Sequence, residues 1–170
     1  SSTLAIKLKD HAKKSAQSAY RTKILFDTNQ LLQRADSESD IIAIAAHQLM
    51  KLLKRDIIIY PVVNNNIGEA NIFLSDGDED EIKDIIIDEK EVAQWVLENN
   101  HQAGATTDIF SQAKFLYFAI RVNDKIYGIV GIHINEKAID SFESSILLSI
   151  LGECAISLEN KKIAREKEES

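Results

Sequence analysis

Cysteine, proline and glycine are all scarce in this chain, which has one cysteine, one proline and six glycines in 170 residues. A single cysteine cannot form an internal disulfide, and Cys154 lies in an apolar helical pattern where a small hydrophobic side chain is expected. Residues 3–35 contain neither glycine nor proline and are mostly good helix formers. The sequence therefore excludes a disulfide-held fold and predicts a first helix longer than a compact domain needs.

Basic charge is also in short supply. The chain has 20 Lys and Arg against 27 Asp and Glu, a net charge of -7, which disfavours nucleic acid and anionic membranes as partners. The 45% hydrophobic and 28% charged residues are typical of one globular domain with a core. No segment approaches the roughly 18 to 20 apolar residues of a membrane span, and the first residues have no signal-peptide pattern. We therefore expect a cytoplasmic domain.

Catalytic and metal-binding signatures are missing as well. His11, His47 and His133 stand alone in helical or strand patterns, and no nucleophile is paired with a base. The alternating aspartates at 76, 78 and 80 resemble a calcium loop, but Glu81 occupies the place of its turning glycine and Ile87 that of its closing glutamate. We expect no catalytic residue, no metal site and no cofactor.

The first half of the chain alternates helical and strand patterns. After the first helix, Ser37 or Ser39 begins a second helix with a broad apolar face. Residues 56–63 form a β-branched strand, and an asparagine-rich turn leads from it to a second strand at residues 70–74. An acidic stretch, residues 76–81, is then expected as a solvated loop, and residues 85–87 as a short buried segment whose type stays open.

The second half repeats this alternation. Residues 92–99 form an amphipathic helix that carries the only tryptophan, Trp95. Residues 115–122 and 126–134 are strands joined by a two-residue turn. Residues 141–168 form a last long helix. This order predicts an α+β fold, with an antiparallel sheet, helices packed mainly on one face, and long N- and C-terminal helices.

The most distinctive segment is the tryptophan helix and the polar loop after it, residues 92–108. Together with the order of elements, this segment resembles the GAF-type regulatory domain of KdpD-like sensor histidine kinases, the osmosensitive kinases that control potassium uptake. The resemblance implies a single GAF-like domain over residues 1–170. Residues 1–35 are then an entering signalling helix, residues 36–140 the sheet core, and residues 141–170 an exit helix towards a kinase core. The residues that carry the resemblance are Trp95, Ala103, Gly104, Thr107 and Asp108.

The resemblance also directs attention to a possible ligand pocket. Trp95 would form its wall beside two tyrosines on neighbouring strands, and the loop after the tryptophan helix would cover it. In the alternative interpretation, Trp95 only plugs the core, and Thr107 and Asp108 only bond the loop backbone. Any ligand is a small molecule or an ion that the sequence does not identify. The candidate pocket or lid consists of Trp95, His101, Gly104, Thr107, Asp108, Tyr117 and Tyr60.

A non-catalytic sensory and signal-transducing domain of a two-component sensor histidine kinase is the function that the resemblance implies. The phosphoacceptor and ATP-binding motifs of such kinases do not occur in the chain. Leu8, Ala12, Ala16 and Ala19 form a narrow seam suited to close helix pairing, and we expect a homodimer through the terminal helices. The other expected partners are the kinase core and membrane segments of the same parent chain. The alternative is a structural dimerisation spacer with no ligand.

Overall fold

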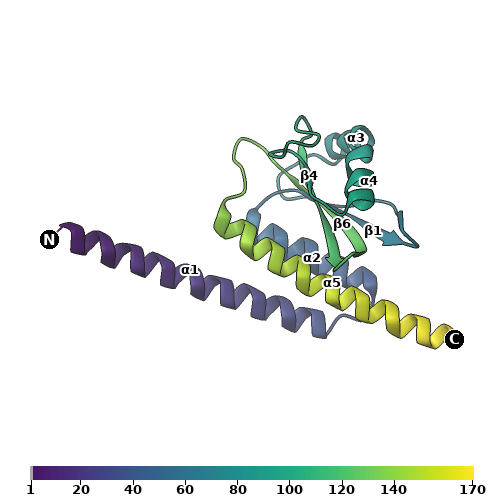
Figure 1. Cartoon of the computed structure of the whole chain (residues 1–170), viewed down its shortest axis with the longest axis horizontal. Coiled ribbons are helices and arrows are strands. Elements are labelled where there is room, and N and C mark those ends of the chain that lie inside the picture. The colour runs from purple at the N-terminus through teal and green to yellow at the C-terminus, as the bar shows by residue number, and fades with distance from the viewer. Residues whose placement is uncertain (1) are drawn as a thin grey trace.

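An antiparallel sheet lies between two unequal layers of helices in the computed structural model, which describes residues 2–170 (Figure 1). Two long helices, α2 (Glu38–Leu53) and α5 (Ser141–Glu169), cover one face of the sheet, and α1 (Ser2–Gln33) packs across them from outside. The two short helices α3 (Glu79–Asp88) and α4 (Lys90–Asn99) belong to the opposite face. The predicted α+β fold with long terminal helices is confirmed.

The sheet is built from the strands of the two predicted hairpins and two additional short strands, β2 (Asn66–Ile67) and β4 (Ala103–Gly104). Its order is β2, β1 (Ile57–Val63), β6 (Lys125–His133), β5 (Phe115–Val122) and β4. A sixth strand, β3 (Asn71–Phe73), also pairs with β1. Positive φ angles at Asn64 and Asn65, and at Asn123, turn the chain within the two hairpins, because asparagine tolerates this backbone better than most residues.

Strand β1 is buried on both of its faces, which explains its continuous apolar run. Ile57 and Ile59 point into the core under α2 and α5, whereas Ile58 and Tyr60 point into the core under α3 and α4. Successive strand side chains alternate between faces, so a strand covered on both sides needs apolar residues at every position. The sheet therefore separates two hydrophobic cores.

Helix α3 corrects the predicted loop of the acidic region and gives the type of the segment after it, which the sequence left open. The segment of residues 85–87 is helical, and the predicted loop of residues 76–81 ends early because Asp78 caps α3, accepting a hydrogen bond from the Glu81 N–H at 3.3 Å. Acidic residues in a first helical turn also interact favourably with the helix dipole. Ile82 and Ile85 are buried while Ile87 is 75% exposed, which is helical rather than strand spacing.

Helix α5 corrects the prediction about apolar segments. By length and composition alone, it contains an 18-residue window apolar enough to cross a membrane, of which 39% is buried inside the domain. Ile146, Ile150 and Leu151 of this helix are buried in the core beneath the sheet. A central core helix meets the same compositional test, because one of its faces must be almost wholly apolar.

Helix α1 has two halves in different surroundings. Residues 2–16 are all exposed and project beyond the rest of the domain (Figure 1). In the second half, Ile24, Thr28 and Leu32 are buried against α2 and α5. The helix runs in the same direction as α5, and the N- and C-terminal ends of the chain lie at opposite ends of the molecule (Figure 1).

Candidate functional site

A buried carboxylate connects the short helices to the sheet. Glu89, between α3 and α4, is only 8% exposed. Its carboxylate accepts hydrogen bonds from the backbone N–H groups of Lys114 at 2.6 Å and Phe115 at 3.3 Å, and from the Tyr117 hydroxyl at 2.8 Å. No local pattern indicates this role, since Glu89 lies in a run of charged residues from 88 to 91.

Tyr117 and Tyr60, both predicted site residues, lie on the same face of the sheet as Glu89. Tyr117 reaches across β6 where a glycine leaves room, because a Cβ on Gly131 would lie 2.9 Å from the tyrosine Cε1 atom. Tyr60 is 3% exposed, and its hydroxyl has no hydrogen-bond partner within residues 2–170. We call Glu89, Tyr60 and Tyr117 the Glu89 cluster.

The environment of this cluster keeps both phenols protonated at neutral pH. Burial raises the pKa of Tyr60 to about 12, and the nearby negative charge of Glu89 adds to the shift. Burial also raises the pKa of Tyr117, again reinforced by Glu89 through its charge and its hydrogen bond. The two hydroxyl groups are therefore hydrogen-bond donors, and only that of Tyr117 has an acceptor among the described residues.

The loop residues Gly104 and Thr107 hold the backbone between β4 and β5. Gly104 has φ +109°, and a Cβ there would lie 2.3 Å from the Phe115 carbonyl oxygen, so the position requires glycine. The Thr107 hydroxyl lies 2.8 Å from the Gly104 carbonyl oxygen and 2.9 Å from that of Ile109. Asp108 is exposed at the surface of the loop. The contacts of Thr107 are those expected of a residue that organises the loop backbone.

Trp95 lies on α4, and His101 follows just after the end of that helix. Val92, Ala93, Val96 and Leu97 of α4 fill the core, whereas Trp95 is half-buried. Its ring contacts the exposed His101 edge-on, with centroids 6.3 Å apart. Trp95 is therefore only partly buried, and it packs against the core that contains Tyr60 and Tyr117.

The space between the sheet and the short helices is filled by side chains. Phe115, Tyr117 and Ile129 are fully buried there, and five hollows on the surface of residues 2–170 are lined by other residues than Tyr60, Tyr117 and Trp95. One hollow does include His101, at the free edge of β5. No group of three or more metal-ligating side chains occurs in the described part of the chain.

The terminal helices are joined to the domain by polar contacts. The Arg21 guanidinium on α1 donates to the hydroxyls of Ser145 at 2.8 Å and Ser149 at 3.0 Å, both on α5. Near the end of α5, Arg165 forms an ion pair with Glu38 of α2 at 2.9 Å. The Arg21 contacts therefore join α1 to α5, and the Arg165 ion pair joins α5 to α2.

Comparison with known proteins agrees with this architecture. The sensor protein KdpD of Clostridium acetobutylicum is 24% identical to the chain over 169 residues, 99% of its length. The crystal structure of the GAF domain of the potassium sensor histidine kinase KdpD from Escherichia coli matches with a TM-score of 0.67 and 18% identity, over 86% of this chain and 98% of that one. The chain is a KdpD-like GAF domain.

The fold is shared with GAF domains of other proteins, and the similarity to KdpD covers only part of that protein. The GAF domain of an Acinetobacter phosphoenolpyruvate-protein phosphotransferase has a similar fold, with a TM-score of 0.62 and 12% identity over 86% of this chain and 98% of that one. No protein-family model matches the sequence. This GAF domain spans about a fifth of the curated KdpD protein, 19% of its length. The similarity therefore concerns one domain of that protein.

Proposed function

We propose that this GAF domain is a non-catalytic sensory and signal-transducing domain of a two-component sensor histidine kinase that controls potassium uptake. Similarity to KdpD over 99% of the chain supports the parent protein. The parallel packing of α1 against α5 supports the mechanism and is the observation that carries it (Figure 1). In this proposal α1 is the entering helix, α5 is the exit helix, and the domain lies on the cytoplasmic side of a membrane-anchored parent.

The contact between α1 and α5 has the properties that a relay between two states requires. Arg21 binds two serine hydroxyls one helical turn apart, so the guanidinium can exchange one acceptor for the other when a helix slides or rotates. Each such hydrogen bond from a charged group contributes about 1.5 to 3 kcal/mol. A twentyfold change in kinase activity would need about 1.8 kcal/mol of coupling, which lies within this range.

A homodimer through the terminal helices completes the proposal. Leu8, Ala12, Ala19 and Phe26 of α1 are exposed, and Leu8 and Phe26 are each 62% exposed. A second copy of the helix would bury these side chains, and the alanines would allow the two backbones to approach closely. The kinase core and the membrane segments of the parent chain are the remaining partners.

A structural dimerisation spacer without a ligand is the second candidate function. The filled space around the Glu89 cluster favours it, because no hollow opens onto Tyr60 or Tyr117 among the main hollows of the described chain. The two candidates share the dimer and differ in whether the helices move. The decisive experiment must therefore measure movement.

Spin labels on the two helices of the full-length parent kinase provide this measurement. We would label Lys23→Cys on α1 and Asn160→Cys on α5, both exposed, in a background where the buried Cys154 is replaced by alanine. Labelled protein diluted with unlabelled protein reports distances within one chain. The relay predicts different distances in the kinase-on and kinase-off states. Identical distances in the two states would favour the spacer.

A further inference from the structure

A second feature of this GAF domain lies at the free edge of the sheet, on the side of α5. Strand β4 pairs with β5 only at Leu116 and Tyr117, so the rest of β5 has no strand partner on that side among residues 2–170. A hollow of about 450 Å³ opens here. Its volume is within the range of sites that hold small molecules. We call it the edge hollow.

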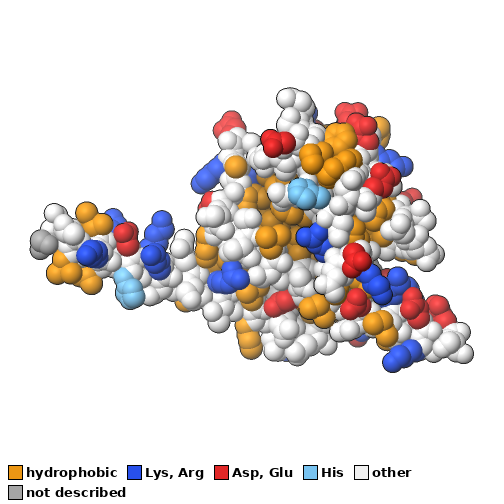
Figure 2. All heavy atoms as spheres, viewed as in Figure 1, with side chains coloured by type: hydrophobic (Ala, Val, Ile, Leu, Met, Phe, Trp, Pro, Cys, Tyr) orange, Lys and Arg blue, Asp and Glu red, His pale blue; other side chains and the backbone are white. Residues whose placement is uncertain are grey.

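The edge hollow has an apolar floor and a polar rim. Phe118 and Ala119 of β5 form one side, and Leu148, Leu151 and Gly152 of α5 form the other. His101, Gln102 and Arg121 form the rim. Figure 2 shows an apolar patch in the middle of this face, bordered by a histidine and by a basic side chain. An apolar floor with a few polar groups at one end fits a molecule that has an apolar body and a polar group at one end.

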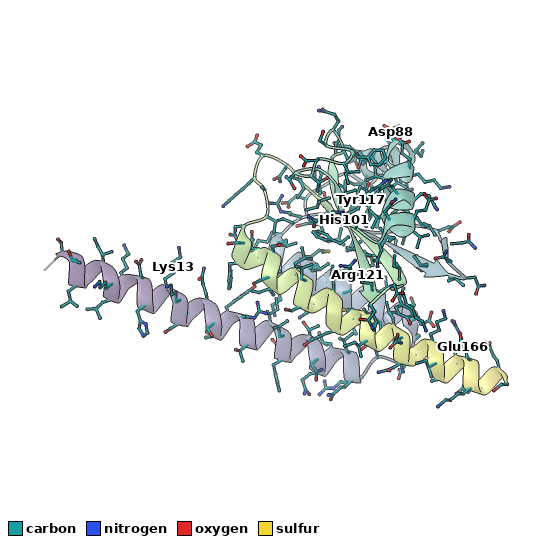
Figure 3. All side chains as sticks on the ribbon, viewed as in Figure 1. Lys13, Asp88, His101, Tyr117, Arg121 and Glu166 are labelled. Atoms are coloured by element: carbon teal, nitrogen blue, oxygen red, sulfur yellow. The ribbon has the colours of Figure 1, made fainter. Side chains whose placement is uncertain are left out.

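The rim carries positive charge without a balancing carboxylate. The lining includes no Asp or Glu, although acidic residues outnumber basic ones in the chain by 27 to 20. Arg121 takes part in no ion pair of residues 2–170, and its Nη1 atom donates to the Asn100 carbonyl at 2.6 Å and to the Asn100 side-chain oxygen at 2.9 Å. These bonds hold the guanidinium at Asn100, the residue before His101, and both Arg121 and His101, labelled in Figure 3, line the hollow.

Gly152 leaves the floor of the hollow open. A Cβ built on this glycine meets no atom within 4 Å, although glycine in the middle of a helix is less stable than alanine. The neighbouring Leu148 is 55% exposed on the same wall. The helix thus presents apolar surface and free space next to the basic rim.

We propose that the edge hollow binds a small organic anion with an apolar body, whose anionic head meets the remaining N–H groups of Arg121 and whose body lies against Leu148 and Gly152. A guanidinium binds carboxylates and phosphates alike through paired hydrogen bonds. The anionic head of the ligand is therefore a carboxylate or a phosphate. This site is distinct from the Glu89 cluster, and its occupation does not depend on the relay.

Titration of the 170-residue chain with octanoate, octyl phosphate and the neutral 1-octanol tests the proposal. Trp95 is the only tryptophan and contacts His101 on the rim, so its fluorescence reports binding. Amide shifts of Ala119 and Gly152 locate the ligand. We expect saturable binding of at least one of the two anions, at least tenfold tighter than that of octanol. The stronger of the two anions identifies the preferred head. Equal binding of octanol, or no shift of these amides with either anion, would overturn the proposal.

Two variants and a matched control test separately how the hollow binds the anionic head and the apolar body of the ligand. Arg121→Gln should weaken anion binding at least tenfold, whereas Arg34→Gln, which removes the same charge from an exposed position on the chain, should leave it unchanged. Because Arg121→Gln also removes the contacts to Asn100, Gly152→Leu provides an independent test. It fills the hollow from a position with free space, and should abolish binding while the chain remains folded. Undiminished binding in either variant would contradict the assigned site.

Discussion

Between the long helices on one side of the sheet, Thr28 and Gln48 are buried and bond each other at 2.9 Å, whereas the side of the short helices buries the Glu89 carboxylate and two phenols. The Thr28 hydroxyl also donates to the Ile24 carbonyl, so this pair satisfies its own polar groups. On the other side a charge is balanced by three donors, and the Tyr60 hydroxyl has no partner in the described chain. The Thr28–Gln48 pair thus joins two neutral side chains, whereas the Glu89 cluster combines a carboxylate with a phenol that has no hydrogen-bond partner among residues 2–170.

Removal of the Glu89 carboxylate should have the largest effect. Glu89→Ala leaves the N–H groups of Lys114 and Phe115 and the hydroxyl of Tyr117 without their acceptor. We expect a loss of about 3 to 4 kcal/mol in the free energy of unfolding, measured by urea denaturation. The exposed Glu91→Ala is the control and should change stability by less than about 0.5 kcal/mol. A loss below about 1 kcal/mol for Glu89→Ala would mean that water replaces the carboxylate.

The hydrogen bond from Tyr117 to Glu89 should carry part of this effect. Tyr117→Phe keeps the ring over Gly131 and removes only the donor to a charged acceptor at 2.8 Å. The expected loss is about 2 kcal/mol in the same assay, the size typical of hydrogen bonds to charged groups. Tyr20→Phe, at a side chain that is 40% exposed, is the matched control and should be neutral. Equal stabilities of the two variants would remove Tyr117 from the cluster.

The position of these tyrosines shows where sequence reasoning succeeds and where it stops. The sequence named Tyr60 and Tyr117 only as candidate pocket residues on two strands, whereas both hairpins followed from their asparagine-rich turns. Glu89 was missed because a charged run between two helices is normally solvated. Its burial depends on backbone donors 25 and 26 residues later in the chain, which no local pattern contains.

The same limit applies to the rest of the candidate site. The secondary-structure type of residues 85–87 was left open because three consecutive isoleucines favour a strand by propensity. Only the Asp78 cap and the burial of Ile82 and Ile85 indicate the helical period. Trp95 lies in a clear helical pattern, but that pattern did not predict that its side chain would be only half-buried. The edge hollow joins two elements far apart in sequence, β5 and α5, and therefore had no local signature.

Alkaline pH should destabilise the domain in part through Tyr60 on the short-helix side. The Tyr60 pKa is raised from 10.0 to about 12, so above pH 10 the unfolded chain releases a proton that the folded chain retains. The stabilisation is complete below pH 10 and is lost as the pH rises towards 12, at a rate of about 1.4 kcal/mol per pH unit for this group. Urea unfolding at several pH values should show a shallower loss for Tyr60→Phe than for the wild type. Parallel curves would show that Tyr60 ionises normally in the folded state.

At neutral pH, Tyr60→Phe should have the smallest effect and the opposite sign. Its hydroxyl is buried without a partner in residues 2–170, and a buried hydroxyl that lacks a hydrogen bond lowers stability. The phenylalanine variant should therefore be more stable than the wild type by about 1 kcal/mol in urea denaturation. A loss of stability would instead mean that a bound water or small polar ligand accepts a hydrogen bond from Tyr60. The sign of this change thus distinguishes a filled core on the short-helix side from a concealed binding site.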